Sequence, residues 1–357
     1  MRLTRAKRAG LVWWGLCGFA TAIVCGDRSN AQPNPKPEAT PFEVASNRLQ
    51  EAIDQGLAPG AALWFSEPGT DAKAAYFGQY HAETRISIGS SSQWLVAATL
   101  MTLVDDEKIS LDEPISQFFP DLESATAALT LRQLLAHSSG LPAHHPCIAN
   151  NTSLLAQCAQ QILETSPSNK PGTEVRFGFG SFQIAGRIAE ILTESSWEDT
   201  FQARLAKPLE MASTSFGDHS NPSVGTGASS TLEDYGKFLT ELLAARAGRG
   251  KVLSARSAGE MLSNQMGDAV LIPESRLAAG HPAIGSWIYA SPQPVEGERF
   301  SSPAIFGFTP WLEVSEKTAG IVLLLAEPDE ARVLAEQIHA DLTLPAPSEA
   351  DSESANP

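Results

Sequence analysis

The chain has 357 residues and a formal net charge of -16, with 41 Asp and Glu residues against 25 Lys and Arg residues. This length is sufficient for a large buried core, in one domain or in two lobes. The acidity argues against binding to nucleic acid or to an anionic membrane surface, and the sequence contains no basic patch interleaved with aromatic residues.

Residues 1–31 have the three parts of a secretory signal peptide. Basic residues at the start precede an apolar run over residues 9–24, and Ser29-Asn30-Ala31 places small residues where a signal peptidase reads them. We therefore predict an exported protein, periplasmic or extracellular, with no membrane span in the mature chain, because the apolar run is short and contains polar breaks. Lipidation of Cys25 is an alternative, for which Val24 is a poor fit.

The chain contains four cysteines, of which Cys17 and Cys25 lie in the predicted signal peptide. Cys147 and Cys158 remain, and an even pair in an exported protein favours a disulfide that closes a short loop. Two buried free thiols are the alternative. His144 and His145 lie close by, but the region lacks the Cys-x-x-Cys spacing of zinc sites, so we predict no metal.

Periodicity predicts strands near both ends of the chain and helices between them. The predicted order is a Pro-rich linker, a helix, a two-stranded hairpin, a helix opened by Ser90, a helical lobe, four strands, a helix and a disordered acidic tail. The linker covers residues 32–41, the first helix 42–55, and the hairpin 60–65 with 74–78. The helix opened by Ser90 covers 90–108 and the helical lobe about 111–262. The four strands are 287–289, 302–308, 311–314 and 320–326, followed by the last helix over 329–342 and the tail over 343–357. We expect an α/β (α+β) domain over residues 42–342, with one antiparallel sheet built from N- and C-terminal strands and flanked by helices, and an inserted helical lobe.

Ser90 follows a strand-like stretch that ends at Gly89 and opens an apolar helical pattern. A serine in this position has two interpretations. As an N-cap it satisfies a backbone N–H of the first turn. As a nucleophile it would lie where N–H groups and the helix dipole stabilise an oxyanion.

Several motifs that follow Ser90 in order favour the nucleophile. The surrounding sequence resembles that of the serine β-lactamase, penicillin-binding protein and esterase superfamily from about residue 43 to residue 341. The motifs that carry the resemblance are residues 86–95, 103–114 with Phe119-Pro120, the very specific 131–142 (LRQLLAHSSGLP), 171–173, 186–190 and 207–211. The resemblance implies the fold predicted above, a site in the cleft between two lobes, acyl or ester compounds as ligands, and no metal or organic cofactor.

In that superfamily three elements carry the chemistry: Ser-x-x-Lys, Tyr-x-Asn, and a Lys- or His-x-Gly strand. Ser90 matches the nucleophile, but Gln93 stands at the lysine position and does not titrate. Phe177 stands at the tyrosine position and Phe179 at the asparagine position. Neither aromatic residue can transfer a proton, so both are expected to be apolar packing residues.

The third element is predicted at residues 304–310, with Ile305 at the cation position and Gly307 at the glycine. A shift of one residue would place Phe306 at the cation position, and neither residue is basic. Gly307 permits close backbone approach, so the Phe308 N–H is predicted to form an oxyanion pair with the Ser90 N–H. The resemblance implies an architectural role for His137.

Three functional hypotheses follow. The first is a catalytically impaired member of the superfamily that binds an apolar ligand in a cleft lined by Phe177, Phe179, Phe306 and Phe308. The second is an active serine acyl hydrolase in which Ser90 works with a base that is foreign to the superfamily, such as a loop histidine or a water held by Gln93. The third is a partner-binding scaffold. A β-lactamase activity and a cell-wall peptidase activity are not expected, because the basic residues are missing.

Overall fold

The computed structural model describes residues 39–120, 122, 124–272, 280–290, 297–302 and 307–343. The predicted signal peptide, most of the predicted linker and nearly all of the predicted tail lie outside these residues. The first helix, α1 (Pro41–Asp54), begins one residue inside the predicted linker, because Thr40 caps it in a reciprocal pair with Glu43.

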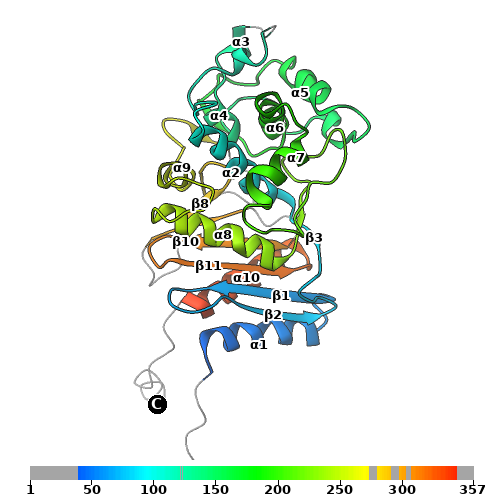
Figure 1. Ribbon diagram of the computed structural model, residues 1–357. Helices are drawn as coiled ribbons and strands as arrows, with labels where there is room; N and C mark the ends of the chain where they lie inside the picture. The colour runs from blue at the N-terminus through cyan, green and yellow to red at the C-terminus, as the bar shows by residue number, and fades with distance from the viewer. Residues whose placement is uncertain are drawn as a thin grey trace, which may run out of the picture. The chain divides into compact units, whose positions relative to one another are not determined.

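A seven-stranded antiparallel sheet joins the two ends of the chain (Figure 1). Its order is β2-β1-β11-β10-β9-β8-β7. The strands are β1 (Gly60–Ser66), β2 (Lys73–Gly78), β7 (His281–Pro282), β8 (Trp287–Ala290), β9 (Glu298–Ser301), β10 (Phe308–Glu313) and β11 (Thr318–Leu324). The pair β1 and β11 brings segments more than 200 residues apart into register. One sheet built from N- and C-terminal strands is what the sequence predicted.

The C-terminal strands differ in detail from the prediction. Of the predicted strand over residues 302–308, residues 303–306 lie outside the described residues. Ser302 follows the end of β9 at Ser301, and Phe308 begins β10. The strand β9 was missed because its sequence looks polar. Arg299 is buried in it, where two hydrogen bonds to Glu336 of the C-terminal helix α10 (Pro328–Thr343) neutralise its charge.

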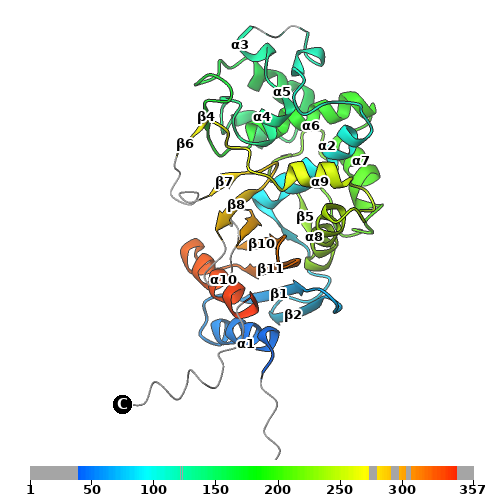
Figure 2. The same cartoon turned by 90° about the vertical axis from the view of Figure 1, so that its left-hand side faces the viewer.

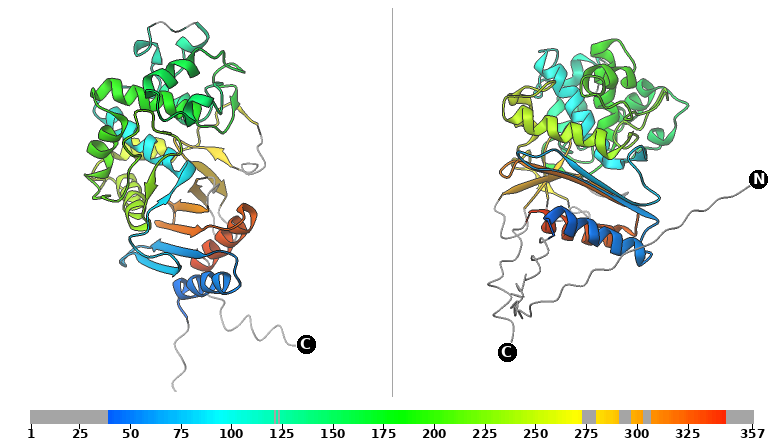
Figure 3. Two further views of the ribbon diagram at one scale, coloured as in Figure 1. Left: turned by 90° about the vertical axis from the view of Figure 1, so that its right-hand side faces the viewer. Right: turned by 60° about the horizontal axis from the view of Figure 1, so that its bottom comes forward.

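Helices cover both faces of the sheet (Figure 3). The helices α1 and α10 share one apolar cluster with one face, and α8 (Leu232–Arg246) packs on the other. The contact between α8 and the sheet is close, because a Cβ at Gly236 would lie 2.3 Å from the Trp64 ring. This tight packing needs glycine at that position.

The helical lobe lies beyond α8 (Figure 2). At its centre α2 (Ser92–Asp105) is buried over most of its length, which agrees with its continuous apolar sequence. The other helices of this region are α3 (Ser124–Ala127), α4 (Leu131–Leu135), α5 (Leu155–Leu163), α6 (Gly180–Thr193), α7 (Trp197–Phe201) and α9 (Ala255–Met261), with a π-helical turn over Gln202–Ala206 and 3-10 turns η1 (Gly89–Ser91), η2 (Ile115–Gln117) and η3 (Pro146–Ala149).

Two short strand pairs connect distant parts of the chain. The pair β3 (Ile86–Ser87) and β5 (Ser229–Ser230) is antiparallel, and the pair β4 (Glu174–Val175) and β6 (Val270–Leu271) is parallel. Within the described residues, no helix combines the length and the apolar character that crossing a membrane requires.

Candidate active site

Ser90 lies in the 3-10 turn η1, directly before α2, and is 2% exposed. Two distant segments hold this turn. The Tyr235 hydroxyl of α8 donates to the Ser91 carbonyl at 3.0 Å, and the Ala228 N–H donates to Ser92 Oγ at 3.1 Å. These two hydrogen bonds fix the position of the turn. Burial raises the pKa of the Tyr235 hydroxyl well above its usual value.

The residue that the sheet places beside Ser90 is Ser302, which the sequence analysis missed. Ser302 Oγ donates to Ser90 Oγ at 3.3 Å, just after the end of β9. The predicted residue Ile305 and its alternative Phe306 both lie outside the described residues. Among the described residues, the strand side of the site thus places a hydroxyl beside Ser90. The signal that could have located Ser302 is the buried, polar strand before it.

Gly307 and Phe308 lie at the start of β10, which packs against η1. The Gly307 carbonyl accepts a hydrogen bond from the Leu324 N–H at 3.0 Å, and its φ of 74° requires glycine. The Phe308 ring is buried against Tyr235, with ring centroids 5.0 Å apart. It therefore belongs to the main core, and the prediction that it lines a cleft together with Phe177 and Phe179 is wrong. The oxyanion pair of Phe308 and Ser90 stays a prediction.

Gln93 is buried in the first turn of α2 and reaches the second motif. Its Nε2 donates to the Gly178 carbonyl at 3.2 Å. Gly178 lies between Phe177 and Phe179, so the structure brings the first and second sequence motifs together. The amide of Gln93 is engaged in a hydrogen bond to the backbone and does not titrate, so it cannot act as a base.

Phe177 and Phe179 form an aromatic wall with Trp287 of β8. The Phe177 ring is 5.3 Å from the Phe179 ring and 6.2 Å from the Trp287 ring, centroid to centroid. Phe177 is buried, whereas Phe179 is half-buried. Half-buried apolar side chains of Met266, Leu271 and Tyr289 pack on the same cluster. The second motif is thus an apolar surface.

His137 lies behind this wall and is 4% exposed. Its ring packs against Phe177, Phe182 and Trp287 at 5.2–5.4 Å, and its Nδ1 accepts a hydrogen bond from the Gly178 N–H at 3.4 Å. Burial lowers the pKa of His137 to about 3. His137 is therefore neutral at physiological pH and supports the wall, in agreement with the architectural role that the resemblance implied.

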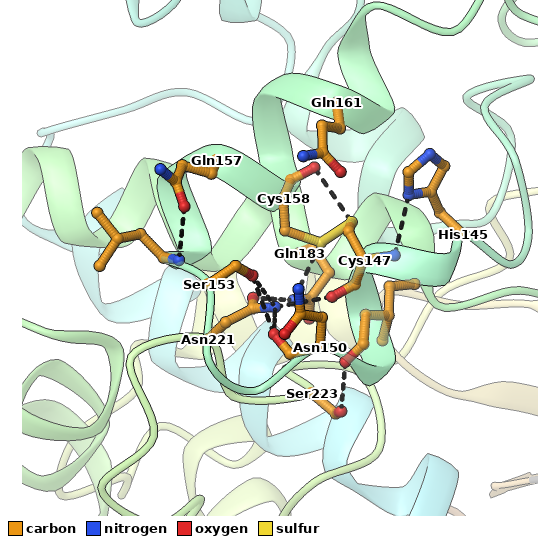
Figure 4. The surroundings of a disulfide bond; sticks show 12 residues. His145, Cys147, Asn150, Ser153, Gln157, Cys158, Gln161, Gln183, Asn221 and Ser223 are labelled. Carbon is orange, nitrogen blue, oxygen red and sulfur yellow. Dashed lines mark hydrogen bonds between the residues drawn. A yellow bond between two sulfur atoms is a disulfide. The ribbon is translucent and has the colours of Figure 1, made fainter.

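The loop before the disulfide covers the other side of the second motif. The Ala143 carbonyl accepts hydrogen bonds from the N–H groups of Phe179 and Gly180, and the His144 ring lies 5.2 Å from that of Phe179. Four residues past Ala143, Cys147 is bonded to Cys158 of α5 (S–S 2.00 Å) (Figure 4). Asn221 donates to the carbonyls of Cys147 and Asn150 at 2.8 Å. The loop is therefore held at several points.

This arrangement offers a hydroxyl pair at a helix start, a neutral amide and an aromatic surface. Gln93, Phe177 and Phe179, at the motif positions, supply no side chain that could act as a general base. Among the residues that the structure describes, no group of three or more His, Cys, Asp or Glu side chains could hold a metal ion.

Comparison with known proteins gives the family and the fold. The Beta-lactamase family model matches residues 45–285. Penicillin-binding protein 4 of Amycolatopsis lactamdurans is 28% identical over 184 residues, which cover 47% of this chain and 48% of that protein. The chain spans about half or less of the length of the curated relatives it matches.

Two solved structures show the same fold at low identity. The D-amino acid amidase of Ochrobactrum anthropi SV3, complexed with L-phenylalanine amide, is 20% identical with a TM-score of 0.70, over 85% of this chain and 98% of that one. EstCE1, a hydrolase with promiscuous acyltransferase activity, is 16% identical with a TM-score of 0.71, over the same shares. Because the family model covers two thirds of the chain, the protein belongs to the Beta-lactamase family.

Proposed function

We propose that this protein is an exported member of the family that has lost its acid–base machinery and binds an apolar acyl compound at the aromatic wall. The observation that carries the proposal is that non-titrating residues replace the lysine and the tyrosine of the first two motifs. Gln93 stands where the family has a lysine and donates to the Gly178 carbonyl, and Phe177 stands where the family has a tyrosine and is buried.

The loss of the base has a large expected effect. A serine hydroxyl needs a neighbouring base to become an effective nucleophile, and catalytic groups that act as a unit lose most of their rate together. His137 does not replace the base, because its ring is buried in the aromatic cluster and its Nδ1 accepts the Gly178 N–H. The site retains binding groups without the group that moves the proton.

The choice of ligand class follows from the wall. Of the three rings only that of Phe179 is half-buried and open to a ligand, whereas Phe177 and Trp287 are buried and support it. Half-buried apolar neighbours extend this surface. Such surfaces bind apolar or aromatic groups, with a few polar atoms for orientation. The relatives with known structures include an amidase complexed with L-phenylalanine amide and a hydrolase with acyltransferase activity, which suggests an amide or ester with an aromatic or alkyl group.

The direct test is intact-mass labelling with a fluorophosphonate of the wild type, of Ser90→Ala, and of Gln93→Lys with Phe177→Tyr. We expect no adduct on the wild type and a Ser90-dependent adduct on the double variant. An adduct on the wild type that disappears in Ser90→Ala would overturn the loss of catalysis. It would establish instead an active hydrolase, which is favoured by the position of Ser90 at a helix start beside the Ser302 hydroxyl.

Binding and export have separate tests. Nile red, a neutral apolar dye, is expected to bind the wild type at least tenfold more tightly than Phe179→Ala, and equal affinities would contradict the wall as the binding site. For export, the mass of the protein purified from the envelope fraction of its host should correspond to a start after Ala31. A full-length mass would contradict cleavage after Ala31. A lipid adduct on Cys25 would instead show that the protein is anchored to the membrane through that residue.

A further inference from the structure

The aromatic wall rests on an unusually free backbone. Phe179 lies between Gly178 and Gly180, and glycine restricts φ and ψ less than any other residue. Both glycines are needed here for steric reasons. A Cβ at Gly178 would lie 2.4 Å from Ala143 Cα, and a Cβ at Gly180 would lie 2.3 Å from the Pro142 carbonyl oxygen. The close loop thus excludes the side chains that would otherwise limit the conformations of this turn.

Groups outside this segment restrain its backbone through hydrogen bonds. The peptide unit between Gly178 and Phe179 is bound at both ends: its carbonyl oxygen accepts from Gln93 Nε2 at 3.2 Å, and its N–H donates to the Ala143 carbonyl at 2.7 Å. The preceding N–H, that of Gly178, donates to His137 Nδ1 at 3.4 Å. Ala143 and Phe179 are half-buried, but the bonds that Gly178 makes with Gln93 and His137 are buried, so a partner lost there leaves a buried polar group unsatisfied.

We propose that Gln93 is the positioning residue of this site: its amide fixes the plane of the Gly178–Phe179 peptide and thereby holds the Phe179 ring in the aromatic wall. Glutamine suits this task because it donates a hydrogen bond without a charge, and a charge at a position that is 1% exposed would be costly. In this chain the lysine position of the family therefore has an architectural task.

The consequence for binding rests on the proposed function, whereas the restraint itself does not. Without Gln93 the peptide keeps only the bond from its N–H to the Ala143 carbonyl, and this single restraint lets Phe179 sample several positions. The wall would have to be ordered again whenever a ligand binds, at an entropic cost that lowers affinity. Gln93 would act on the ligand through Phe179, without touching it.

The experiment uses hydrogen–deuterium exchange and Nile red binding on the same variants. Gln93→Met removes the donor at similar length and flexibility, and Gln93→Lys retains a donor. Gln202→Met is the matched control, because Gln202 is half-buried and its Nε2 also donates to a distant backbone carbonyl, that of Thr214, at 2.8 Å. The measurement follows the exchange of peptides that contain residues 176–181 in the unliganded protein.

We expect at least tenfold faster exchange of residues 178–180 in Gln93→Met, a change of less than twofold in Gln202→Met, and a rate for Gln93→Lys between that of the wild type and that of Gln93→Met. Nile red affinity should fall about tenfold in Gln93→Met alone. Unchanged exchange in Gln93→Met would overturn the proposal. Faster exchange with no Nile red binding by the wild type would leave the restraint established and would refute the proposed ligand site instead.

Discussion

Two buried glutamines, Gln183 in the helical lobe and Gln93 at the candidate site, use their amides in different ways. Gln183 Nε2 donates to Asn221 Oδ1 and to the Pro222 carbonyl, both at 3.0 Å, and its Oε1 accepts from the Val224 N–H at 2.6 Å. Gln93 donates through Nε2 to one carbonyl, in a turn flanked by glycines. The first amide joins several segments, and the second restrains a single peptide.

This difference distinguishes a structural region, the lobe around Gln183, from the candidate site around Gln93. The network of Gln183 continues through Asn221 to the disulfide loop, so a buried chain of hydrogen bonds holds that part of the lobe (Figure 4). The Gln93 amide makes one hydrogen bond, to the Gly178 carbonyl, and the neighbouring Phe177 and Phe179 are held by ring packing. A change at Gln183 should therefore affect global stability, whereas a change at Gln93 should affect the local order of the wall.

The largest effect is expected for Gln183→Leu. This change leaves Asn221 Oδ1, the Pro222 carbonyl and the Val224 N–H without their partner inside the lobe, and each unsatisfied buried group costs about 1–3 kcal/mol. We expect a loss of about 3 kcal/mol or more in the free energy of unfolding, measured in urea at pH 7. A loss below about 1 kcal/mol in the free energy of unfolding would contradict the view that the Gln183 network holds this part of the lobe.

A pH titration of stability tests the buried state of His137. The pKa of His137 is lowered to about 3 in the folded protein, whereas an unfolded histidine titrates near 6.5. Between these values the unfolded chain binds a proton that the folded chain does not, so the free energy of unfolding falls as the pH is lowered. This term is about 2.5 kcal/mol between pH 7 and pH 4.5.

His137→Asn is the appropriate variant for this titration. Asparagine tolerates the left-handed backbone of His137, whose φ is 59°, and it does not titrate. Urea unfolding at both pH values should show a smaller loss in the variant than in the wild type. If the wild type and the variant lose equal free energy of unfolding between pH 7 and pH 4.5, the pKa of His137 is not lowered by folding.

The disulfide is expected to contribute somewhat less. It closes a loop between residues 11 apart in the sequence, and the chain-entropy model gives such a bridge about 2–3 kcal/mol. Because Asn221 holds the same loop, we expect Cys147→Ala with Cys158→Ala to lose about 2 kcal/mol, measured by urea unfolding, and to retain Nile red binding. Loss of binding at full folding would show that the wall depends on the bridge rather than on Gln93.

The smallest effect on stability is expected at the site itself. Gln93→Met leaves the Gly178 carbonyl without its donor and should cost about 1 kcal/mol, because the glycine-flanked turn can rearrange. The same urea measurement checks this value against Gln183→Leu. A loss as large as that of Gln183→Leu would remove the distinction between the two regions.

The sequence by itself determined the family, the strands at both ends with helices between them, and the identities at the first two motifs. These features are local or depend on fixed spacing, so Ser90, Gln93, Phe177 and Phe179 could be placed without coordinates. It also assigned His137 an architectural role correctly, because the surrounding motif is specific.

Only the tertiary structure decided which side chains meet. Ser302 reaches Ser90 because β9 pairs beside β10, and β9 could not be recognised while the ion pair of Arg299 with Glu336 was unknown. The Phe308 ring was assigned to the wrong cluster, because its partner Tyr235 comes from a helix more than 70 residues earlier. The bond from Gln93 to Gly178 spans 85 residues. Such contacts depend on how the segments pack, and residue periodicity carries no information on packing between distant segments.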